Sequence, residues 1–225
     1  MTSDKKVIQS MFDAGVHFGY SKATRHPSVK DFVFGIKDGV QIIDLEQTQS
    51  ALAEAKEFLK EVAPTGKVLF VASKNESQDI IKRNAKDLGM PYVTNRWVGG
   101  TLTNFSQIKR RIQKLERMLD EREKGEFAKY TKKEQLMLDR EIEKLKKNYG
   151  GLVGVTEMPK AVVIVDSGYE EIAMKEANIM NIPVVSISST DCDISTIEYP
   201  IVANDSTRKS VDLIISELTS AIKAN

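Results

Sequence analysis

Hydrophobic residues along this chain follow two alternating spacings, one typical of buried strands and the other of amphipathic helices. Short apolar, β-branched runs predict strands at 32–35 with 41–43, 67–72, 91–94, 161–165, 183–187 and 199–202. Helical spacing between these runs predicts helices near 45–62, 76–88 and 169–180, and a last helix after Asp205. Strands that are apolar on both faces and alternate with helices indicate a parallel sheet covered on both sides. The expected fold class is therefore α/β, with a doubly wound, mainly parallel sheet flanked by helices.

Three helix starts are marked by a polar residue followed three positions later by Gln or Glu. In this capping box the first side chain accepts a hydrogen bond from a backbone amide of the first turn, and the second side chain reaches back. The predicted pairs are Asp44 with Gln47, Asn75 with Gln78, and Ser167 with Glu170.

Between the third and fourth strand units, two long amphipathic helices follow each other directly. The first carries apolar residues at alternating spacings of three and four, at Phe105, Ile108, Ile112, Leu115 and Leu119, and ends near Lys124-Gly125. A capping box of Thr131 and Glu134 begins the second, whose stripe is Leu138, Ile142, Leu145 and Tyr149 before Gly150-Gly151. Narrow stripes of this kind form the seam of a coiled coil.

We therefore expect an antiparallel helical hairpin that protrudes from the sheet, because its remaining faces are heavily charged. A hairpin folded back onto the sheet is the alternative. The expected organisation is a discontinuous α/β sandwich domain, 1–103 and 150–225, interrupted by a coiled-coil hairpin, 104–149.

A short helix is predicted before the sheet. Its apolar face is formed by Val7, Ile8, Met11 and Phe12, and it ends at Ala14-Gly15. The loop that follows is basic and aromatic, with His17, Tyr20, Lys22, Arg25, His26 and Lys30. It is either a nucleic-acid contact or only a solvated connection.

The charge of the chain is unevenly distributed. The formal net charge of +1 argues against nucleic-acid binding, which draws most of its affinity from Lys and Arg. However, segment 104–149 has 14 basic and 9 acidic residues, a net charge of +5, whereas segment 150–225 has 5 basic and 11 acidic residues, a net charge of −6. Such segregation suggests one surface that faces a polyanion. Alternatively, the basic and the acidic segments form two unrelated surfaces that are both exposed to solvent.

Composition favours a cytosolic protein. No apolar run approaches the roughly 20 residues needed to cross a bilayer, and no hydrophobic block follows the first charged residues. The single cysteine, Cys192, cannot form an internal disulfide, which fits a reducing compartment.

The chemistry of an enzyme is hard to find in the sequence. A doubly wound sheet often binds nucleotides, but the turns at 73–75 and 166–168 lack a glycine fingerprint and a phosphate loop. The only two histidines, His17 and His26, lie together near the amino terminus, away from a candidate nucleophile. Cys192 between two aspartates is a weak candidate for a metal ligand or a nucleophile, and a loop thiol is the favoured interpretation. We expect no enzyme activity and no cofactor.

Segment 95–105, which joins a strand to the hairpin, is not explained by packing alone. It combines Arg96 with the only tryptophan, Trp97, two glycines, and a Thr and an Asn. Glycines permit close backbone approach, and Arg and amide groups suit phosphate and ribose. In the alternative interpretation, Trp97 fills the core and the glycines form a hinge.

Three segments, in order along the chain, resemble motifs of the bacterial small-subunit ribosomal protein S2 family. They are AGVHFG at 14–19, RWVGGTLTN at 96–104, and EAN at 176–178 with IPV at 182–184. The similarity spans nearly the whole chain. Departures from the family pattern are Tyr20 for histidine, Ser189-Thr190-Asp191 for Asp-Thr-Asn, Ile194 for proline, and Ser206 for a second acidic residue after Asn204-Asp205.

The resemblance implies a doubly wound sheet with a projecting coiled-coil hairpin, without catalysis. It also implies a place on the solvent side of the small ribosomal subunit between head and body, contact with 16S ribosomal RNA and neighbouring proteins, and support for the docking of ribosomal protein S1. No membrane or small-molecule substrate is expected.

We expect three segments to bind structured RNA, mostly through its phosphates. The predicted residues are His17, Lys22, Arg25, His26 and Lys30 in the amino-terminal loop, Arg96, Trp97, Gly99, Gly100, Thr103 and Asn104 in the central segment, and Lys109, Arg110, Arg111 and Lys114 on the hairpin. Two alternatives stay open, an enzyme that binds a phosphorylated small molecule near Ser73, Asp166 and Ser167, and a ribosome-independent interaction scaffold with an acidic carboxyl-terminal third.

Overall fold

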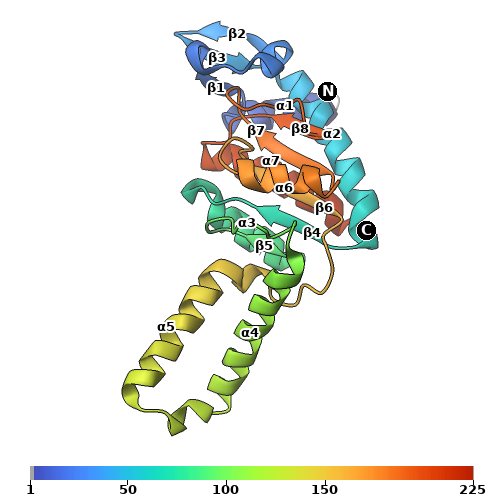
Figure 1. Ribbon diagram of the computed structural model, residues 1–225. Coiled ribbons are helices and arrows are strands. Elements are labelled where there is room, and N and C mark those ends of the chain that lie inside the picture. The colour runs from blue at the N-terminus through green and yellow to red at the C-terminus, as the bar shows by residue number, and fades with distance from the viewer. Residues whose placement is uncertain (1–2, 225) are drawn as a thin grey trace.

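A five-stranded parallel sheet lies at the centre of the structure, a computed structural model that describes residues 3–224 (Figure 1). Its strands are β4 (Val68–Val71), β5 (Tyr92–Val93), β6 (Ala161–Val165), β7 (Val184–Ser188) and β8 (Tyr199–Val202). The spatial order is β5-β4-β6-β7-β8, and every neighbouring pair is parallel. The order reverses between β4 and β6, the place where doubly wound proteins have a crevice at the carboxyl ends of the strands.

Helices cover both faces of this sheet, as the sequence predicts. Alternate side chains such as Val68 and Phe70 pack against α1 (Ser3–Asp13), α2 (Leu45–Val62), α3 (Asn75–Asp87) and α7 (Arg208–Lys223). The intervening ones, such as Leu69 and Val71, pack against α6 (Glu171–Ile179) and the base of the hairpin. All positions of β4, β6 and β7 are buried, and β4 and β6 are accordingly apolar on both faces, whereas β7 also carries the buried Ser186 and Ser188. The doubly wound α/β fold is confirmed.

The first predicted strands belong to a separate sheet, which corrects the expectation that they join the parallel one. Strands β1 (Phe18–Ser21), β2 (Val33–Lys37) and β3 (Val40–Ile43) form an antiparallel sheet in the order β1-β3-β2. The reason is the two-residue turn Asp38-Gly39, with φ angles of 51° and 80°. Such a turn closes an antiparallel hairpin, whereas a parallel pair requires a long crossover.

Short 3-10 segments connect these elements: η1 (Lys22–Thr24), η2 (Pro27–Phe32), η3 (Ala63–Thr65), η4 (Glu126–Lys129) and η5 (Gly150–Leu152). No helix within residues 3–224 has the length and apolar character needed to span a membrane.

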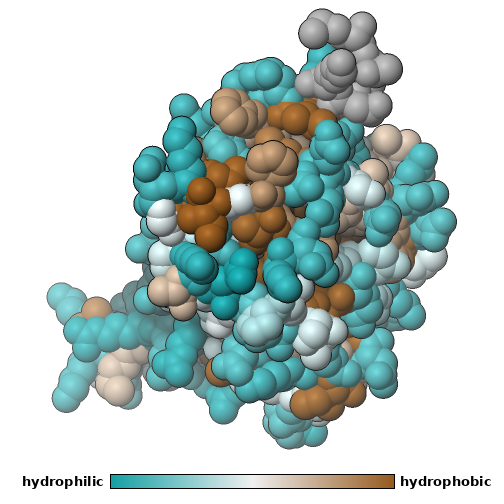
Figure 2. All heavy atoms as spheres, turned by 90° about the horizontal axis from the view of Figure 1, so that it is seen from above, coloured by the Kyte–Doolittle hydropathy of each residue, from teal (hydrophilic) through white to brown (hydrophobic). Residues whose placement is uncertain are grey.

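Viewed from the end of the antiparallel sheet, the surface carries a group of apolar residues (Figure 2). Exposed aromatic side chains of this end are Phe12, Phe18 and Phe34. Phe12 therefore does not join Met11 in the core as its helical spacing predicts.

Two of the four predicted helix caps are present. Asp44 accepts a hydrogen bond from the amide of Glu46 (2.9 Å), and Thr131 with Glu134 forms a complete capping box. The other two predictions are wrong. Helix α3 begins at Asn75 itself, with Lys74 as the N-cap, and α6 begins only at Glu171. The hydroxyl of Ser167 instead forms a hydrogen bond with Ser188 on β7 (2.7 Å), so a tertiary partner replaces the local one.

The helical hairpin consists of α4 (Phe105–Glu123) and α5 (Lys132–Tyr149) and extends away from the sheet (Figure 1). The alternative in which it folds back is therefore wrong. Its inner seam is buried and includes Ile108, Ile112, Leu115, Met118, Ile142, Leu145 and Tyr149. Leu119 is only partly buried, and Met118 takes its expected place. The supercoiling of a coiled coil stays a prediction.

Ion pairs join the two helices of the hairpin, and a glycine allows close packing where the chain returns to the sheet. Lys114 pairs with Glu141 across the two helices, and Arg122 pairs with Asp139 (3.2 Å). At the return to the body, Gly151 lies so close to the carbonyl oxygen of Tyr92 that a Cβ atom would clash with it. The η5 segment that follows α5 therefore packs directly on the edge strand β5.

Candidate nucleic-acid interface

The central segment 95–104 is folded around one carboxylate, Glu176 on α6. The amides of Gly100 (2.7 Å), Leu102 (2.9 Å) and Thr103 (3.2 Å) donate to its two oxygens, as do the indole of Trp97 (3.1 Å) and the hydroxyl of Thr103 (3.2 Å). Burial favours a higher pKa for the Glu176 carboxyl, but these hydrogen bonds outweigh it and lower the pKa below the ordinary value. Glu176 is therefore a buried, charged centre of the loop.

This arrangement occupies part of the segment that was predicted to contact RNA. The side chain of Trp97 is buried in the core, so the core-filling interpretation holds. The predicted donors of Trp97, Gly100 and Thr103 already donate to Glu176 and are not free to hold a phosphate. Arg96, Gly99 and Asn104 lie at the surface instead. The role of Glu176 was missed, although it lies in one of the resembling motifs.

His17, another predicted RNA contact, is largely buried. Its imidazole is 8% exposed and stacks on Phe12, with ring centroids 4.4 Å apart, and against Phe18 at 4.0 Å. Burial lowers the pKa of His17 below its ordinary value, so the ring stays neutral near pH 7. A buried, neutral imidazole is not a phosphate ligand.

The rest of the amino-terminal loop keeps its cations near the surface. Lys22 and Lys30 are exposed, and Arg25 is half-buried. The Nδ1 atom of His26 lies 2.8 Å from the hydroxyl of Ser28 and 3.7 Å from Asp193. His26 thus attaches the loop to the carboxyl-terminal part of the chain, whereas Lys22 and Lys30 are exposed to solvent.

On the hairpin, two of the four predicted cations have intramolecular partners. Lys109 donates to the carbonyl oxygen of Thr156 (3.1 Å), and Lys114 pairs with Glu141. Arg110 and Arg111 are exposed and, among the residues the structure describes, have no ion-pair partner. The available positive charge at the start of α4 is therefore that of these two arginines.

A cluster of four lysines, which the sequence analysis missed, lies where the hairpin meets the sheet. Lys82 and Lys86 of α3 and Lys146 and Lys147 of α5 surround one hollow of about 340 Å³ beside β5. All four are exposed, and within residues 3–224 none of their ammonium groups has an ion-pair partner. Lys147 also borders a second hollow together with Arg96. We call these four residues the lysine cluster.

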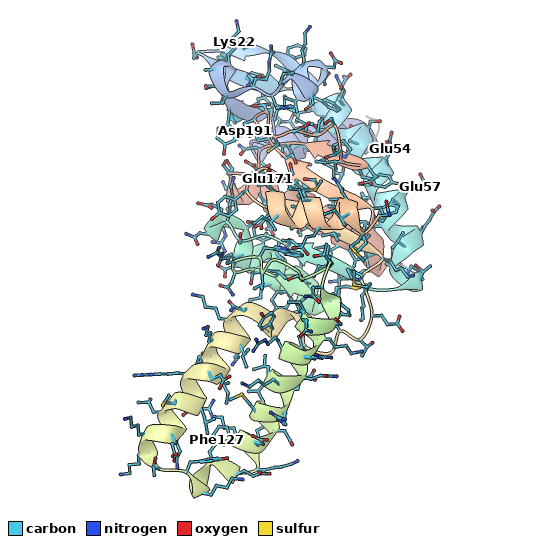
Figure 3. All side chains as sticks on the ribbon, in the orientation of Figure 1. Lys22, Glu54, Glu57, Phe127, Glu171 and Asp191 are labelled. Carbon is cyan, nitrogen blue, oxygen red and sulfur yellow. The ribbon has the colours of Figure 1, made fainter. Side chains whose placement is uncertain are left out.

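The three predicted segments do not form one compact patch. Lys22 lies at one end of the molecule, and Phe127, at the tip of the hairpin, lies at the other (Figure 3). Only Arg96 lies beside the lysine cluster. The most concentrated free positive charge is therefore at the base of the hairpin.

A model of the family described as ribosomal protein S2 matches residues 11–225 of the chain. The chain belongs to the ribosomal protein S2 family. It is 43% identical over 220 residues to the small ribosomal subunit protein uS2 of Corynebacterium jeikeium, covering 96% of this chain and 79% of the relative. It is 40% identical over 219 residues to the uS2 protein of Karelsulcia muelleri, covering 97% and 99% of the two chains. The S2 family is a family of structural ribosomal proteins and not of enzymes.

Two of the positions at which this S2 family member departs from the expected pattern meet in the structure. The hydroxyls of Tyr20 and Ser206 lie 2.7 Å apart, in place of the expected histidine and acidic residue. Beside them, Thr190 accepts a hydrogen bond from the amide of Tyr20 (2.9 Å). The two side chains are therefore joined by a hydrogen bond between hydroxyl groups.

The reversal of strand order between β4 and β6, where doubly wound proteins have a crevice, holds an ion cluster. Lys74 pairs with Asp166 and lies 3.5 Å from Asp205. Asp166, Asp205 and Cys192 each have a possible metal-ligating atom within 4.8 Å of the others, but the ammonium of Lys74 already pairs with Asp166 and lies close to Asp205. Burial, followed by the nearby carboxylates, raises the pKa of the Cys192 thiol to about 12, so the thiol is protonated at neutral pH.

Proposed function

We propose that the chain is a structural component of the small ribosomal subunit that binds 16S ribosomal RNA, mainly through the lysine cluster and Arg96. The observation that carries this proposal is the convergence of unpaired cations from two distant parts of the sequence. Unpaired, exposed lysines that lie together repel one another, and a polyanion relieves that repulsion.

The proposed contacts position the protein and do not read the RNA sequence. Ammonium and guanidinium groups bind phosphates, which are the same at every nucleotide. Arg110 and Arg111 extend the basic surface along the hairpin, and Gly99 and Asn104 allow the RNA backbone to approach the central segment. Lys22, Arg25 and Lys30 form a second, separate contact at the opposite end.

The position between head and body, and the support of ribosomal protein S1, are part of the same proposal and rest on the family resemblance. An elongated molecule with one basic surface at the base of the hairpin and another at the end that carries Lys22 suits a place that joins two parts of an RNA particle. The exposed side chains of Phe12, Phe18 and Phe34 form an apolar surface of the kind that protein partners cover. In this view the protein acts in the cytoplasmic ribosome.

Sedimentation of the tagged chain from a cell lysate through a sucrose gradient tests the assignment. A parallel sample is treated with EDTA, which separates the ribosomal subunits. We expect the chain to travel with the small subunit in both samples. A chain that stays at the top of both gradients as free protein contradicts the proposal.

A further inference from the structure

A hollow of about 440 Å³ opens at the carboxyl edge of the sheet, between the starts of α3 and α6 and the end of α5. Its walls include Arg96, Lys147, Tyr169, Glu170, Gln78 and Asn95. We propose that this hollow receives one unstacked base of the bound RNA, stacked on the ring of Tyr169. This inference rests on the proposed function and adds a nucleotide-binding site to it.

Tyr169 is presented to solvent by a fixed turn. Its side chain is 62% exposed, so the ring does not serve the core. Its amide donates to the side chain of Asp166 (2.9 Å), a residue with a φ of 64°, and this contact fixes the backbone. Ile172, also exposed, continues the apolar surface into the hollow. An exposed ring on a fixed backbone is the feature on which proteins stack unpaired bases.

The charges around the hollow indicate which part of a nucleotide enters it. Glu170 is buried in the wall, where its carboxylate accepts hydrogen bonds from the amide (2.7 Å) and the hydroxyl of Ser73. A phosphate placed inside would face this carboxylate at short range and be repelled. Arg96 and Lys147, by contrast, are exposed cations. The base of the nucleotide therefore enters the hollow, and its phosphate binds outside the hollow at Arg96 and Lys147.

Two amide side chains supply polar groups for the edge of the base. The Nε2 atom of Gln78 donates to the carbonyl oxygen of Ser73 (2.8 Å), and the Nδ2 atom of Asn95 donates to that of Lys147 (2.7 Å). Each amide is thereby held in place by a backbone carbonyl. Fixed amides beside an aromatic ring are typical of sites for single-stranded RNA.

A free mononucleotide has the same chemistry as an RNA nucleotide, and the geometry favours the RNA. Lys147 borders both this hollow and the one enclosed by the lysine cluster. The cations therefore continue beyond the space that one nucleotide fills. A chain of phosphates uses all of them, whereas a mononucleotide uses only the first.

Ultraviolet cross-linking of small subunits that contain the full chain, followed by mass spectrometry of peptide–nucleotide adducts, tests the inference. We expect an adduct on Tyr169 and none on Tyr130, an exposed tyrosine near the tip of the hairpin that serves as the matched control. In parallel, affinity for single-stranded oligonucleotides is measured with Tyr169→Phe, which keeps the ring, and Tyr169→Ala, which removes it. The first variant should bind like the wild type, and the second about 5-fold or more weakly.

The outcomes separate this inference from the proposed function. Adducts elsewhere on the chain with none on Tyr169, together with unchanged binding by Tyr169→Ala, overturn the inference and leave the RNA-binding function standing. Absence from the small subunit overturns the proposed function itself. A rise in melting temperature with AMP, GMP, CMP or UMP that depends on Tyr169, without an adduct in the subunit, assigns the hollow to free nucleotides and overturns the RNA site.

Discussion

A single carboxylate, that of Glu176, accepts hydrogen bonds from three backbone amides, an indole and a hydroxyl of segment 97–103. The loop that carries Arg96 is thereby attached to α6 and to the sheet behind it. The position of Arg96 at the surface depends on a residue 80 positions further along the chain. Loss of the negative charge of Glu176 should therefore disrupt the loop more than any other single change in it.

Glu176→Gln should lower the free energy of unfolding by about 2 kcal/mol, because one oxygen acceptor becomes an amide donor that faces buried donors. The hydrogen bonds hold the pKa of Glu176 below its ordinary value of 4.5, so the stabilisation is present above that pH. It is lost as the pH falls through the lowered pKa of the folded state. Urea unfolding at pH 7 and at acidic pH measures both effects, and the difference between the two proteins should shrink in acid.

Glu171→Gln on the same helix is the matched control for this prediction. Glu171 is exposed and, within residues 3–224, forms an ion pair with Lys175 alone, so the loss of its charge should change the free energy of unfolding by less than about 0.5 kcal/mol. Equal effects of the two substitutions would show that the loop does not depend on the Glu176 charge.

Asp205→Asn should stabilise the protein at neutral pH. Burial, followed by the charge of Asp166, raises the pKa of Asp205 from 3.8 to about 6, even though Lys74 lies nearby. The folded state then holds a proton that the unfolded state releases, so stability is greatest in acid and falls as the pH rises through about 6. The asparagine of the variant does not ionise, so the variant does not lose stability in this way. Its free energy of unfolding at pH 7 should exceed that of the wild type by about 1–3 kcal/mol.

Urea unfolding of the wild type and Asp205→Asn between pH 4 and pH 7 checks this, and the two curves should converge toward pH 4. Asp212→Asn, at an exposed aspartate that pairs with Arg83, provides the control and should show no such convergence. Parallel curves for wild type and Asp205→Asn would contradict the prediction.

At the scale of helices and strands, features that depend on neighbouring residues could be predicted from the sequence, whereas features that depend on distant residues could not. The Thr131 capping box was predictable because all of its hydrogen bonds lie within four residues. The expected Ser167 cap failed because that hydroxyl has a partner on another strand, Ser188. Similarly, the Asp38-Gly39 turn is encoded locally, but its consequence, a second sheet, is a property of strand pairing.

The hairpin should unfold separately from the sheet when its seam is weakened. Ile142 is fully buried between α4 and α5, and Ile142→Ala should destabilise the hairpin by about 2–4 kcal/mol through lost burial and the cavity that remains. Amide hydrogen exchange should accelerate in α4 and α5 while the amides of β4 and β6 keep their protection. Leu136→Ala, at an exposed position of the same helix, should leave exchange unchanged. Equal acceleration in the sheet would show that the hairpin is not a separate unit.

At the scale of the whole molecule, RNA affinity should depend on salt through the lysine cluster. Replacing Lys82, Lys86, Lys146 and Lys147 with Ala should reduce the slope of log affinity against log salt by about 0.7–0.9 per lost phosphate contact. Binding of 16S ribosomal RNA measured between low and moderate salt gives the slope. A control with four other exposed lysines replaced, Lys37, Lys133, Lys209 and Lys223, keeps the net charge equal. The same reduction in both variants would remove the cluster from the interface.

The sequence by itself determined the α/β class, the helical hairpin, most element positions and the family resemblance. All of these depend on the spacing of neighbouring residues or on short motifs, and both can be identified in the amino-acid sequence. Only the tertiary structure decided that His17 and Trp97 are buried and that Lys82 and Lys86 lie beside Lys146 and Lys147. The physical reason is that burial and charge convergence depend on which distant segments the strand order brings together, and no local spacing contains that information.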